Sequence, residues 1–187
     1  MTILVLDRDG TLFDTCELNF RSYSNASENL KVNLDENALQ ASICKGESFS
    51  TFQLKVWSKA SSVEREALKS YKSEFFSRNL SLVRVNPELI SLIESNGDSV
   101  YMATRATLES TNTLLEHFGV RIQKDNVYST QTYPGSDKVS IMQNILEIGG
   151  GLPASIRLID DSMESIKKVS AAGFSVQLYP HYCSFKG

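Results

Sequence analysis

The pattern of hydrophobic and polar positions divides the chain into three stretches. The first contains four consecutive apolar residues, 3–6, and such a run predicts a buried strand of a parallel sheet. From residue 15 to residue 84, apolar residues recur at three- and four-residue steps, which predicts helices, and no strand pattern interrupts them. From residue 85 onward, short apolar runs alternate with helical periods, which predicts a parallel sheet covered by helices.

The spacing also predicts individual elements. In the middle stretch we expect a loop at 44–48, a helical pattern at 49–57, and helices at 15–30, 35–43 and 62–80. In the last stretch we expect helices at 87–96, 107–118, 138–148 and 162–172, and strands at 99–103, 127–129, 155–159 and 174–178. Together these elements predict an α/β fold, a three-layer α/β/α sandwich with a parallel sheet, and a small all-helical insert after the first strand.

Composition and charge narrow the classes of function. Nineteen Lys and Arg residues against 22 Asp and Glu residues give a net charge of −3, and no basic block indicates a nucleic-acid or membrane-surface partner. The sequence shows neither a signal peptide nor a long apolar span, and its three cysteines lack the spacing of metal ligands. We therefore expect a cytoplasmic protein with reduced thiols, present as a monomer or a small homo-oligomer.

Two carboxylates, Asp7 and Asp9, follow the first strand before Gly10 and Thr11 end it. Side chains two residues apart in extended chain point to the same side, here at the carboxyl end of a strand, where open α/β sheets bind ligands. Two like charges held so close are costly unless a cation lies between them. The pattern favours a metal site in which one carboxylate is also a nucleophile over the alternative, a solvated acidic turn.

Other strand and helix ends carry groups of complementary chemistry: Thr104, Lys138, and the pair Asp160 and Asp161. Because the carboxyl ends of parallel strands meet at one edge of a sheet, we expect these groups to lie near Asp7. Carboxylate oxygens suit Mg²⁺, and Mg²⁺, lysine and hydroxyl groups together stabilise the charge of phosphoryl transfer. A carboxylate can also act as the nucleophile, through an aspartyl-phosphate intermediate.

These motifs, in this order, resemble those of the haloacid dehalogenase superfamily of hydrolases, in the phosphatase branch with a helical cap that includes phosphoglycolate phosphatases and β-phosphoglucomutase. The resemblance extends over essentially the whole chain. It implies a Rossmann-like catalytic core at residues 1–14 and 85–187, and a cap at residues 15–84 that closes over the phosphate site as a lid.

The resemblance also implies the roles of the site residues. Asp7 would attack phosphorus, and Asp9 would carry the proton to the leaving group and offer its backbone carbonyl to the metal. Thr104 would hydrogen-bond the phosphoryl group, with help from the backbone of Arg105. Lys138 would neutralise the nucleophile and the phosphate.

The metal site implied by the resemblance is built from Asp7, Asp9 and Asp161, and Asp160 would support Asp161 without binding the metal directly. Lys45 and Gly46 lie where related caps carry a substrate-specificity loop, so Lys45 is expected to meet the non-reacting part of the substrate; the alternative is a solvated loop lysine. Val139 follows Lys138, where phosphoglycolate-phosphatase-like members commonly carry proline.

We therefore expect a Mg²⁺-dependent phosphatase of a small phosphorylated metabolite: a sugar phosphate, phosphoglycolate or a nucleotide, in that order. Two alternatives stay open, namely a phosphotransferase or phosphomutase on the same scaffold and a non-catalytic regulatory protein that binds a phosphorylated ligand. A receiver-type signalling domain is excluded. It would carry its paired acids on the first strand and its phosphorylated Asp on a middle strand, and it would leave the large helical insert unexplained.

Overall fold

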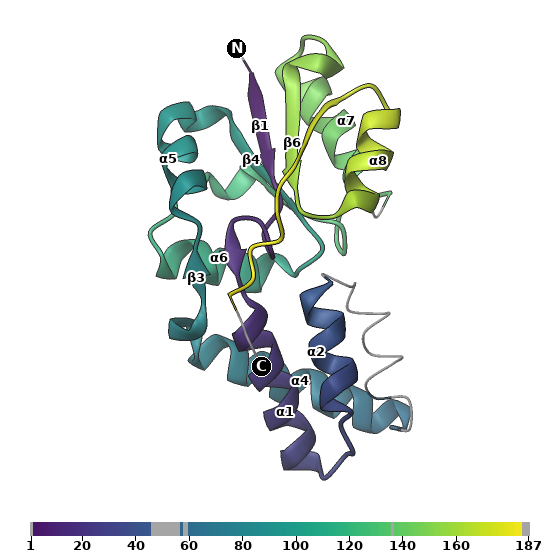
Figure 1. Cartoon of the computed structure of the whole chain (residues 1–187). Helices are drawn as coiled ribbons and strands as arrows, with labels where there is room; N and C mark the ends of the chain where they lie inside the picture. Colours follow the sequence, from purple (N-terminus) through teal and green to yellow (C-terminus); the bar gives the residue numbers. More distant parts are fainter. Residues whose placement is uncertain (1, 46–56, 58–59, 136, 185–187) are drawn as a thin grey trace. The chain divides into compact units, whose positions relative to one another are not determined.

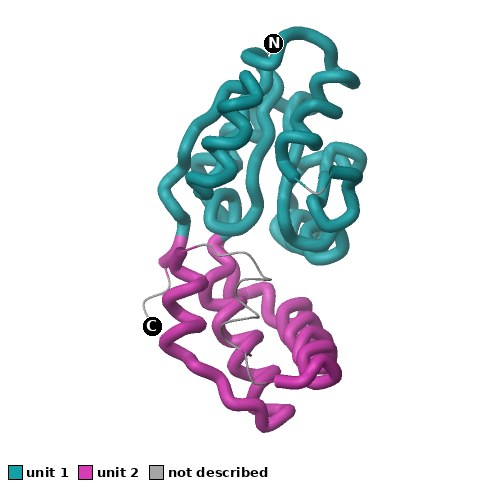
Figure 2. The backbone as a smooth tube through the Cα atoms, turned by 90° about the vertical axis from the view of Figure 1, so that its right-hand side faces the viewer, with its two compact units in different colours: residues 1–13, 85–182 teal, residues 14–84, 183–187 magenta. Residues whose placement is uncertain are grey.

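A computed structural model of the chain describes residues 2–45, 57, 60–135 and 137–184 (Figure 1). The chain forms two compact units, drawn in different colours in Figure 2. Unit 1 consists of Met1–Phe13 and Val85–Tyr182, and unit 2 consists of Asp14–Arg84 and the C-terminal residues from Cys183. The sequence assigns residues 183 and 184 to the catalytic core, whereas in the structure they group with unit 2.

Unit 1 is built on a five-stranded parallel sheet in the order β5-β4-β1-β6-β7. The strands are β1 (Ile3–Leu6), β4 (Val100–Thr104), β5 (Val127–Ser129), β6 (Ile156–Asp160) and β7 (Ser175–Leu178). β1 is central, and its last residue, Leu6, is level with Met102 of β4 and Ile159 of β6. The carboxyl ends of these three strands therefore lie side by side, and Asp7 follows directly at this edge.

Among the described residues of unit 1, four helices cover the sheet, and each begins at a polar side chain that caps its first backbone N–H groups. They are α5 (Pro87–Asn96), α6 (Leu108–His117), α7 (Lys138–Gly149) and α8 (Met163–Ala171), and their capping residues are Asn86, Thr107, Asp137 and Ser162. Figure 1 shows α5 and α6 on one side of the sheet and α7 and α8 on the other. The predicted α/β fold with a parallel sheet is confirmed.

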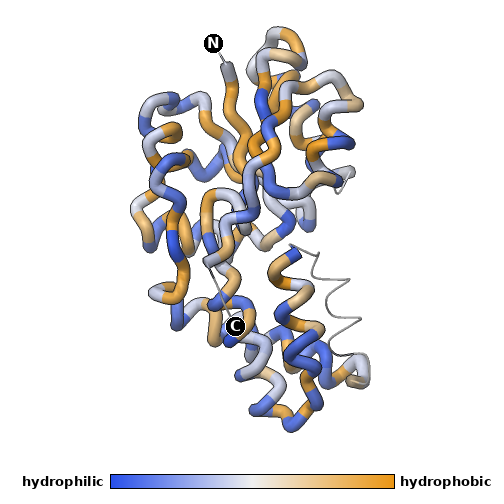
Figure 3. Tube along the Cα trace, in the orientation of Figure 1, coloured by the Kyte–Doolittle hydropathy of each residue, from blue (hydrophilic) through white to orange (hydrophobic). Residues whose placement is uncertain are grey.

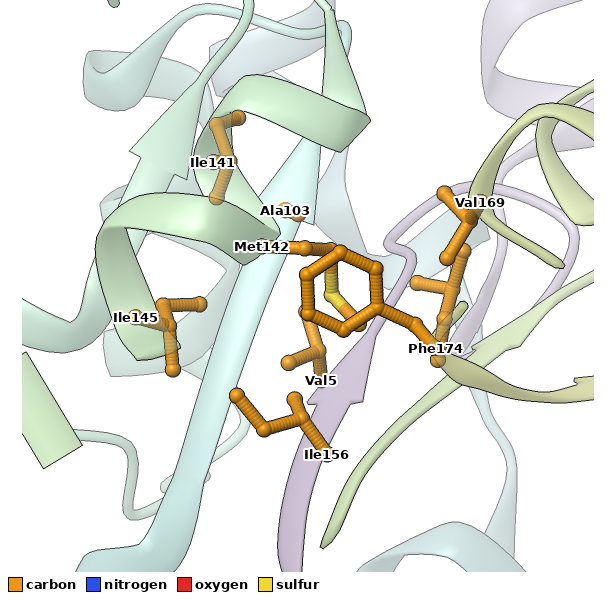
Figure 4. Close-up of a cluster of buried hydrophobic side chains, with 9 residues drawn as sticks. Val5, Ala103, Ile141, Met142, Ile145, Ile156, Val169 and Phe174 are labelled. Carbon is orange, nitrogen blue, oxygen red and sulfur yellow. The ribbon is translucent and has the colours of Figure 1, made fainter. Parts of the chain in front are cut away.

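The core under α7 and α8 is a continuous apolar cluster (Figure 4). Val5 of β1 and Leu158 of β6 contribute to it from the sheet, while Met142 and Ile145 contribute from α7. Figure 3 shows β1 as hydrophobic along its length, in keeping with a central strand that is buried on both faces. This packing holds β1, and hence the residue that follows it, in a fixed position.

Unit 2 is helical, with α1 (Cys16–Leu30), α2 (Glu36–Cys44), α4 (Ser62–Arg78) and a short 3₁₀ turn, η1 (Leu80–Leu82). Its core is centred on Trp57, which is 1% exposed, packs on Tyr23 at a ring separation of 5.0 Å, and donates from Nε1 to the hydroxyl of Ser27 at 3.0 Å. The predicted helical insert is confirmed. Most of the loop expected at 44–48 and the helical pattern expected at 49–57 lies outside the described residues.

Two short strands that the hydrophobic pattern does not indicate, β2 (Phe13–Asp14) and β3 (Arg84–Val85), pair where the chain leaves and re-enters unit 1. A third connection follows Tyr182, so the two units are joined by three segments of chain. Among the described residues, no helix combines the length and the apolar character needed to cross a membrane.

Candidate active site

Three carboxylates converge at the carboxyl edge of the sheet in unit 1. Asp7 follows β1, Asp160 ends β6, and Asp161 comes next; each offers an oxygen within 4.8 Å of the other two. The backbone N–H of Asp7 donates to the carbonyl of Ile159 at 2.9 Å, which continues the pairing of β1 with β6 past the last residue of β1. Asp7 and Asp160 are 7% and 0% exposed. The parallel register therefore brings together acids that are far apart in the sequence.

Lys138 places an ammonium group among these carboxylates. It is the first residue of α7 and is buried, and its Nζ donates to Asp7 Oδ1 and, at 2.6 Å, to Asp160 Oδ2. An unpaired buried charge is costly, so the lysine and the two carboxylates depend on one another for their stability. Asp160 is held further by the N–H of Ser162, which donates to its Oδ1 at 2.8 Å.

The three carboxylates and Lys138 together carry more negative than positive charge. Burial, together with the charges of Asp160 and Asp161, raises the pKa of Asp7 to about 7, against the lowering effect of Lys138. Burial lowers the pKa of Lys138, but the charges of Asp7 and Asp160 outweigh this effect, so its net pKa is raised and the lysine stays charged. With three carboxylates around one ammonium group, the site attracts either a proton or a second cation.

Asp161 is oriented by neighbours on two sides. The hydroxyl of Thr11 donates to its Oδ1 at 3.3 Å and accepts from its N–H at 3.1 Å, and His181 Nδ1 contacts its Oδ2. Gly10 adopts φ +75°, and a Cβ atom there would lie 2.5 Å from Asp161 Oδ2 and still closer to Nδ1 of the His181 ring. Sequence analysis misses His181, because nothing in the pattern after β7 links it to an acid twenty residues earlier.

Asp9 faces a different partner. Its Oδ2 accepts from Arg8 Nε at 2.9 Å and from a terminal guanidinium nitrogen at 2.7 Å, while the other terminal nitrogen donates to the hydroxyls of Ser110 (2.8 Å) and Thr111 (3.3 Å) on α6. The Arg8 side chain is 5% exposed and that of Asp9 is 37% exposed. Asp9, the second acid of the motif, thus forms an ion pair with a buried arginine. The two hydrogen bonds of this pair fix the orientation of the Asp9 carboxylate.

The other predicted site residues fall in three places. Thr104 ends β4 and is buried, and its hydroxyl accepts from the N–H of Ala106 at 3.0 Å. Arg105 is exposed, and its carbonyl accepts from Gln131 Nε2 at 2.6 Å. Lys45 is exposed at the end of α2 in unit 2, and Gly46 lies outside the described residues.

The donor set at this edge fits Mg²⁺. The three grouped carboxylates supply hard oxygen ligands, and their excess negative charge is the condition that a divalent cation relieves. Asp160 is 0% exposed and accepts from Lys138 and from the N–H of Ser162, so this residue suits a supporting role, whereas Asp7 and Asp161 are less deeply buried. Asp7 and Asp161 are the better placed direct ligands.

Comparison with known proteins identifies the family. Residues 4–178 match the haloacid dehalogenase-like hydrolases, whereas no curated protein matches the chain. The fold is similar to that of a mutant of CbbY from Rhodobacter sphaeroides in complex with xylulose-(1,5)bisphosphate (TM-score 0.74, 18% identity, 100% of this chain and 90% of that chain covered). It is also similar to a haloacid dehalogenase-superfamily hydrolase of subfamily IA from Geobacter sulfurreducens (TM-score 0.71, 16% identity, 100% of this chain and 89% of that chain covered). A third similar structure is described as a predicted phosphoglycolate phosphatase from Haemophilus somnus (TM-score 0.68, 18% identity, 94% of this chain and 84% of that chain covered).

At these identities the solved structures establish the likeness of fold, and the family match carries the assignment. The chain spans most of the length of each of the three structures. The chain belongs to the haloacid dehalogenase-like hydrolase family.

Proposed function

We propose that this protein is a Mg²⁺-dependent phosphatase that hydrolyses a small phosphomonoester through an aspartyl-phosphate on Asp7. The observation that carries the proposal is the position of Asp7. It lies buried at the end of the central strand, bonded to a buried lysine and grouped with two further carboxylates. A carboxylate in such surroundings is fixed in place and is kept from bulk water, as covalent catalysis requires.

In the proposed reaction, a carboxylate oxygen of Asp7 attacks phosphorus while the bond from phosphorus to the leaving oxygen breaks. Lys138, bonded to the nucleophile, offsets the negative charge that gathers as the phosphate approaches. Thr104 accepts from the N–H of Ala106, which keeps its hydroxyl hydrogen available for a phosphoryl oxygen. Mg²⁺, held by Asp7 and Asp161 and supported by Asp160, would supply further positive charge to that group.

Asp9 is the proposed proton carrier. It would give a proton to the leaving oxygen in the first step and take one from the attacking water in the second, when the aspartyl-phosphate is hydrolysed. Arg8 binds one carboxylate oxygen of Asp9 through two hydrogen bonds and so fixes the orientation of the carboxylate that would exchange the proton. Arg8 therefore acts as a positioning residue, anchored on Ser110 and Thr111.

The proposed substrate class is a small phosphorylated metabolite, with a sugar phosphate placed first. The support is indirect: the structurally similar CbbY mutant is described in complex with a sugar bisphosphate. Lys45 stays a predicted substrate contact. The alternatives on the same scaffold, a phosphotransferase or a phosphomutase, use the same residues and are separated by the fate of the phosphoryl group.

The test is phosphate release from a panel of sugar phosphates, phosphoglycolate and nucleotides, measured with Mg²⁺ and with EDTA. We expect metal-dependent release that Asp7→Asn lowers by about 10³-fold or more, the scale at which loss of a covalent nucleophile acts. Asp125→Asn, at an exposed position on unit 1, serves as the matched control and should retain full activity.

The same samples are analysed for a phosphoryl group moved to a new position or to a second molecule. Such a product in place of free phosphate would make the protein a mutase or a transferase. Neither product, in a protein that binds Mg²⁺, would contradict the proposal and favour a regulatory protein that binds a phosphorylated ligand.

A further inference from the structure

All three cysteines of the chain lie in unit 2, although they come from opposite ends of the sequence. Cys16 begins α1 and is 3% exposed, Cys44 ends α2 and is exposed, and Cys183 lies half-buried in the C-terminal segment. None of them takes part in the proposed phosphatase chemistry. Their common location therefore needs a separate account.

Cys183 is the centre of this group. Its sulfur lies within 4.8 Å of the sulfur of Cys16, and the two thiols are hydrogen-bonded. Cys183 also interacts with the thiol of Cys44. A disulfide needs two cysteines that lie close together in the fold, and the two sulfurs already lie near each other.

Asp14 fixes both members of the pair. Its Oδ1 accepts from the N–H of Cys16 at 3.1 Å, and its Oδ2 accepts from the N–H and the hydroxyl of Ser184 at 2.7 Å and 2.5 Å. One buried carboxylate thus binds the first turn of α1 and the residue after Cys183. The two sulfurs are held together by the backbone on either side, rather than by chance contact of mobile side chains.

The surroundings of Cys16 and Cys44 keep these two thiols in their protonated form before any reaction. Burial raises the pKa of the Cys16 thiol far above its usual range, and the neighbouring Cys183 and Asp14 add to this effect. Burial, together with Cys183, also raises the pKa of Cys44. Nucleophilic attack by a cysteine uses the thiolate, so the reaction of Cys16 needs a proton acceptor close to its sulfur, and the carboxylate of Asp14 lies there.

We propose that Cys16 and Cys183 form an oxidation site, in which a hydroperoxide converts the two thiols into a disulfide within unit 2. The sulfur of Cys183, the more exposed residue of the two, loses its proton and attacks the peroxide. The O–O bond breaks, Cys183 becomes a sulfenic acid, and the departing oxygen takes up the proton and leaves as water or an alcohol. The sulfur of Cys16 then attacks that of Cys183 while its proton passes to Asp14. The S–S bond forms, the S–O bond breaks, and hydroxide leaves and takes up a proton as water.

The disulfide would join the start of α1 to the segment that follows unit 1. It would close a loop that contains nearly the whole chain, and such long loops lose the most conformational entropy in the unfolded state when they are cross-linked. It would also anchor the third of the three segments that connect the units. This proposal does not depend on the proposed phosphatase activity.

The test uses the full-length protein, reduced and then treated with hydrogen peroxide at low molar excess. We expect two of the three thiols to be lost, a mass lower by two hydrogen atoms, and a proteolytic peptide pair that links Cys16 to Cys183 and separates on reduction. The thermal unfolding midpoint should rise on oxidation and return on reduction. Cys44→Ser, at an exposed position, should form the same link and serves as the control variant.

Cys183→Ser should form no link and show no rise in the unfolding midpoint. Asp14→Asn should slow the formation of the link about tenfold or more, because it removes both the proton acceptor and the charge that holds Ser184. A link between Cys44 and Cys183, a dimer joined between chains, or oxidation of Cys183 to a sulfinic acid without any link would each overturn the proposal. Peptide mapping of the unmutated protein decides the question even if a variant fails to fold.

Discussion

Replacing Lys138 by methionine tests the charge balance of the site most directly. The substitution keeps much of the side-chain volume but removes the ammonium group that bonds Asp7 and Asp160, both of which are buried. Removing one partner of a buried ion pair costs about 3–5 kcal/mol, because the remaining charge has no partner and no water. We expect a loss of this size in the free energy of unfolding at about pH 8.5.

The loss in the free energy of unfolding caused by Lys138→Met should be smaller at low pH, because of the way that Asp7 titrates. Its pKa is raised in the folded protein, so folding favours the protonated form, and stability falls as the pH rises from the unfolded value of 3.8 to about 7. Lys138 lowers the pKa of Asp7, so in the variant this fall continues above pH 7. At about 1.4 kcal/mol per pH unit, the loss caused by the substitution should be about 2 kcal/mol smaller at about pH 5.5 than at about pH 8.5.

The measurement is urea unfolding followed by far-ultraviolet circular dichroism at both pH values, in EDTA so that no cation replaces the lysine. Lys168→Met is the matched control: this lysine pairs with Glu164 on the surface of α8, where both side chains are well exposed. The control should leave the unfolding midpoint unchanged at either pH. An equal loss at both pH values, or one below about 1 kcal/mol at the higher pH, would refute the reasoning.

Three further predictions concern the same edge of the sheet. Without Mg²⁺, the unmutated protein should lose up to about 4 kcal/mol of stability between about pH 4 and pH 7, because Asp7 loses the proton that folding favours; Mg²⁺ should flatten this slope in the same urea titration. Gly10→Ala should cost at least about 1–2 kcal/mol and weaken Mg²⁺ binding by calorimetry, because φ is +75° and the new Cβ would displace Asp161; unchanged affinity would argue against this. Arg8→Leu should lower turnover by about 10–100-fold with Mg²⁺ affinity intact, which is part of the roughly 10²–10⁴-fold that general acid–base catalysis contributes; full activity would show that Arg8 does not position Asp9.

Much of the fold follows from local patterns. Residues 3–6 form an apolar run because a central parallel strand is buried on both faces, and Pro87 and Asp137 stand at helix starts because their conformations or side chains suit those positions. The convergence of Asp7 with Asp160 follows from the same patterns, since parallel strands end at one edge. The fold class was therefore predictable from these patterns, and the family from the resemblance of the motifs around Asp7, Lys138 and Asp161.

Contacts made by the segment after β7 could not be predicted in this way. Tyr179 donates its N–H to the carbonyl of Asp160 at 2.9 Å and Tyr182 to that of Gly10 at 2.6 Å, which brings His181 against Asp161. No hydrophobic period or spacing encodes this path. The environment of Arg8 was likewise hidden: sequence analysis cannot tell an arginine on the surface from one buried against α6.

The attachment of the C-terminal segment to Asp14 has a consequence for how this cap can be exchanged. A domain inserted at one point can be replaced as one continuous piece, but unit 2 consists of two segments of chain, residues 14–84 and the residues from 183, which are separated by most of unit 1. A graft of residues 14–84 alone would leave the carboxylate of Asp14 without the two donors of Ser184. Recombination between relatives therefore has to exchange the insert and the C-terminal segment together, and a fusion partner is better attached at the N-terminus.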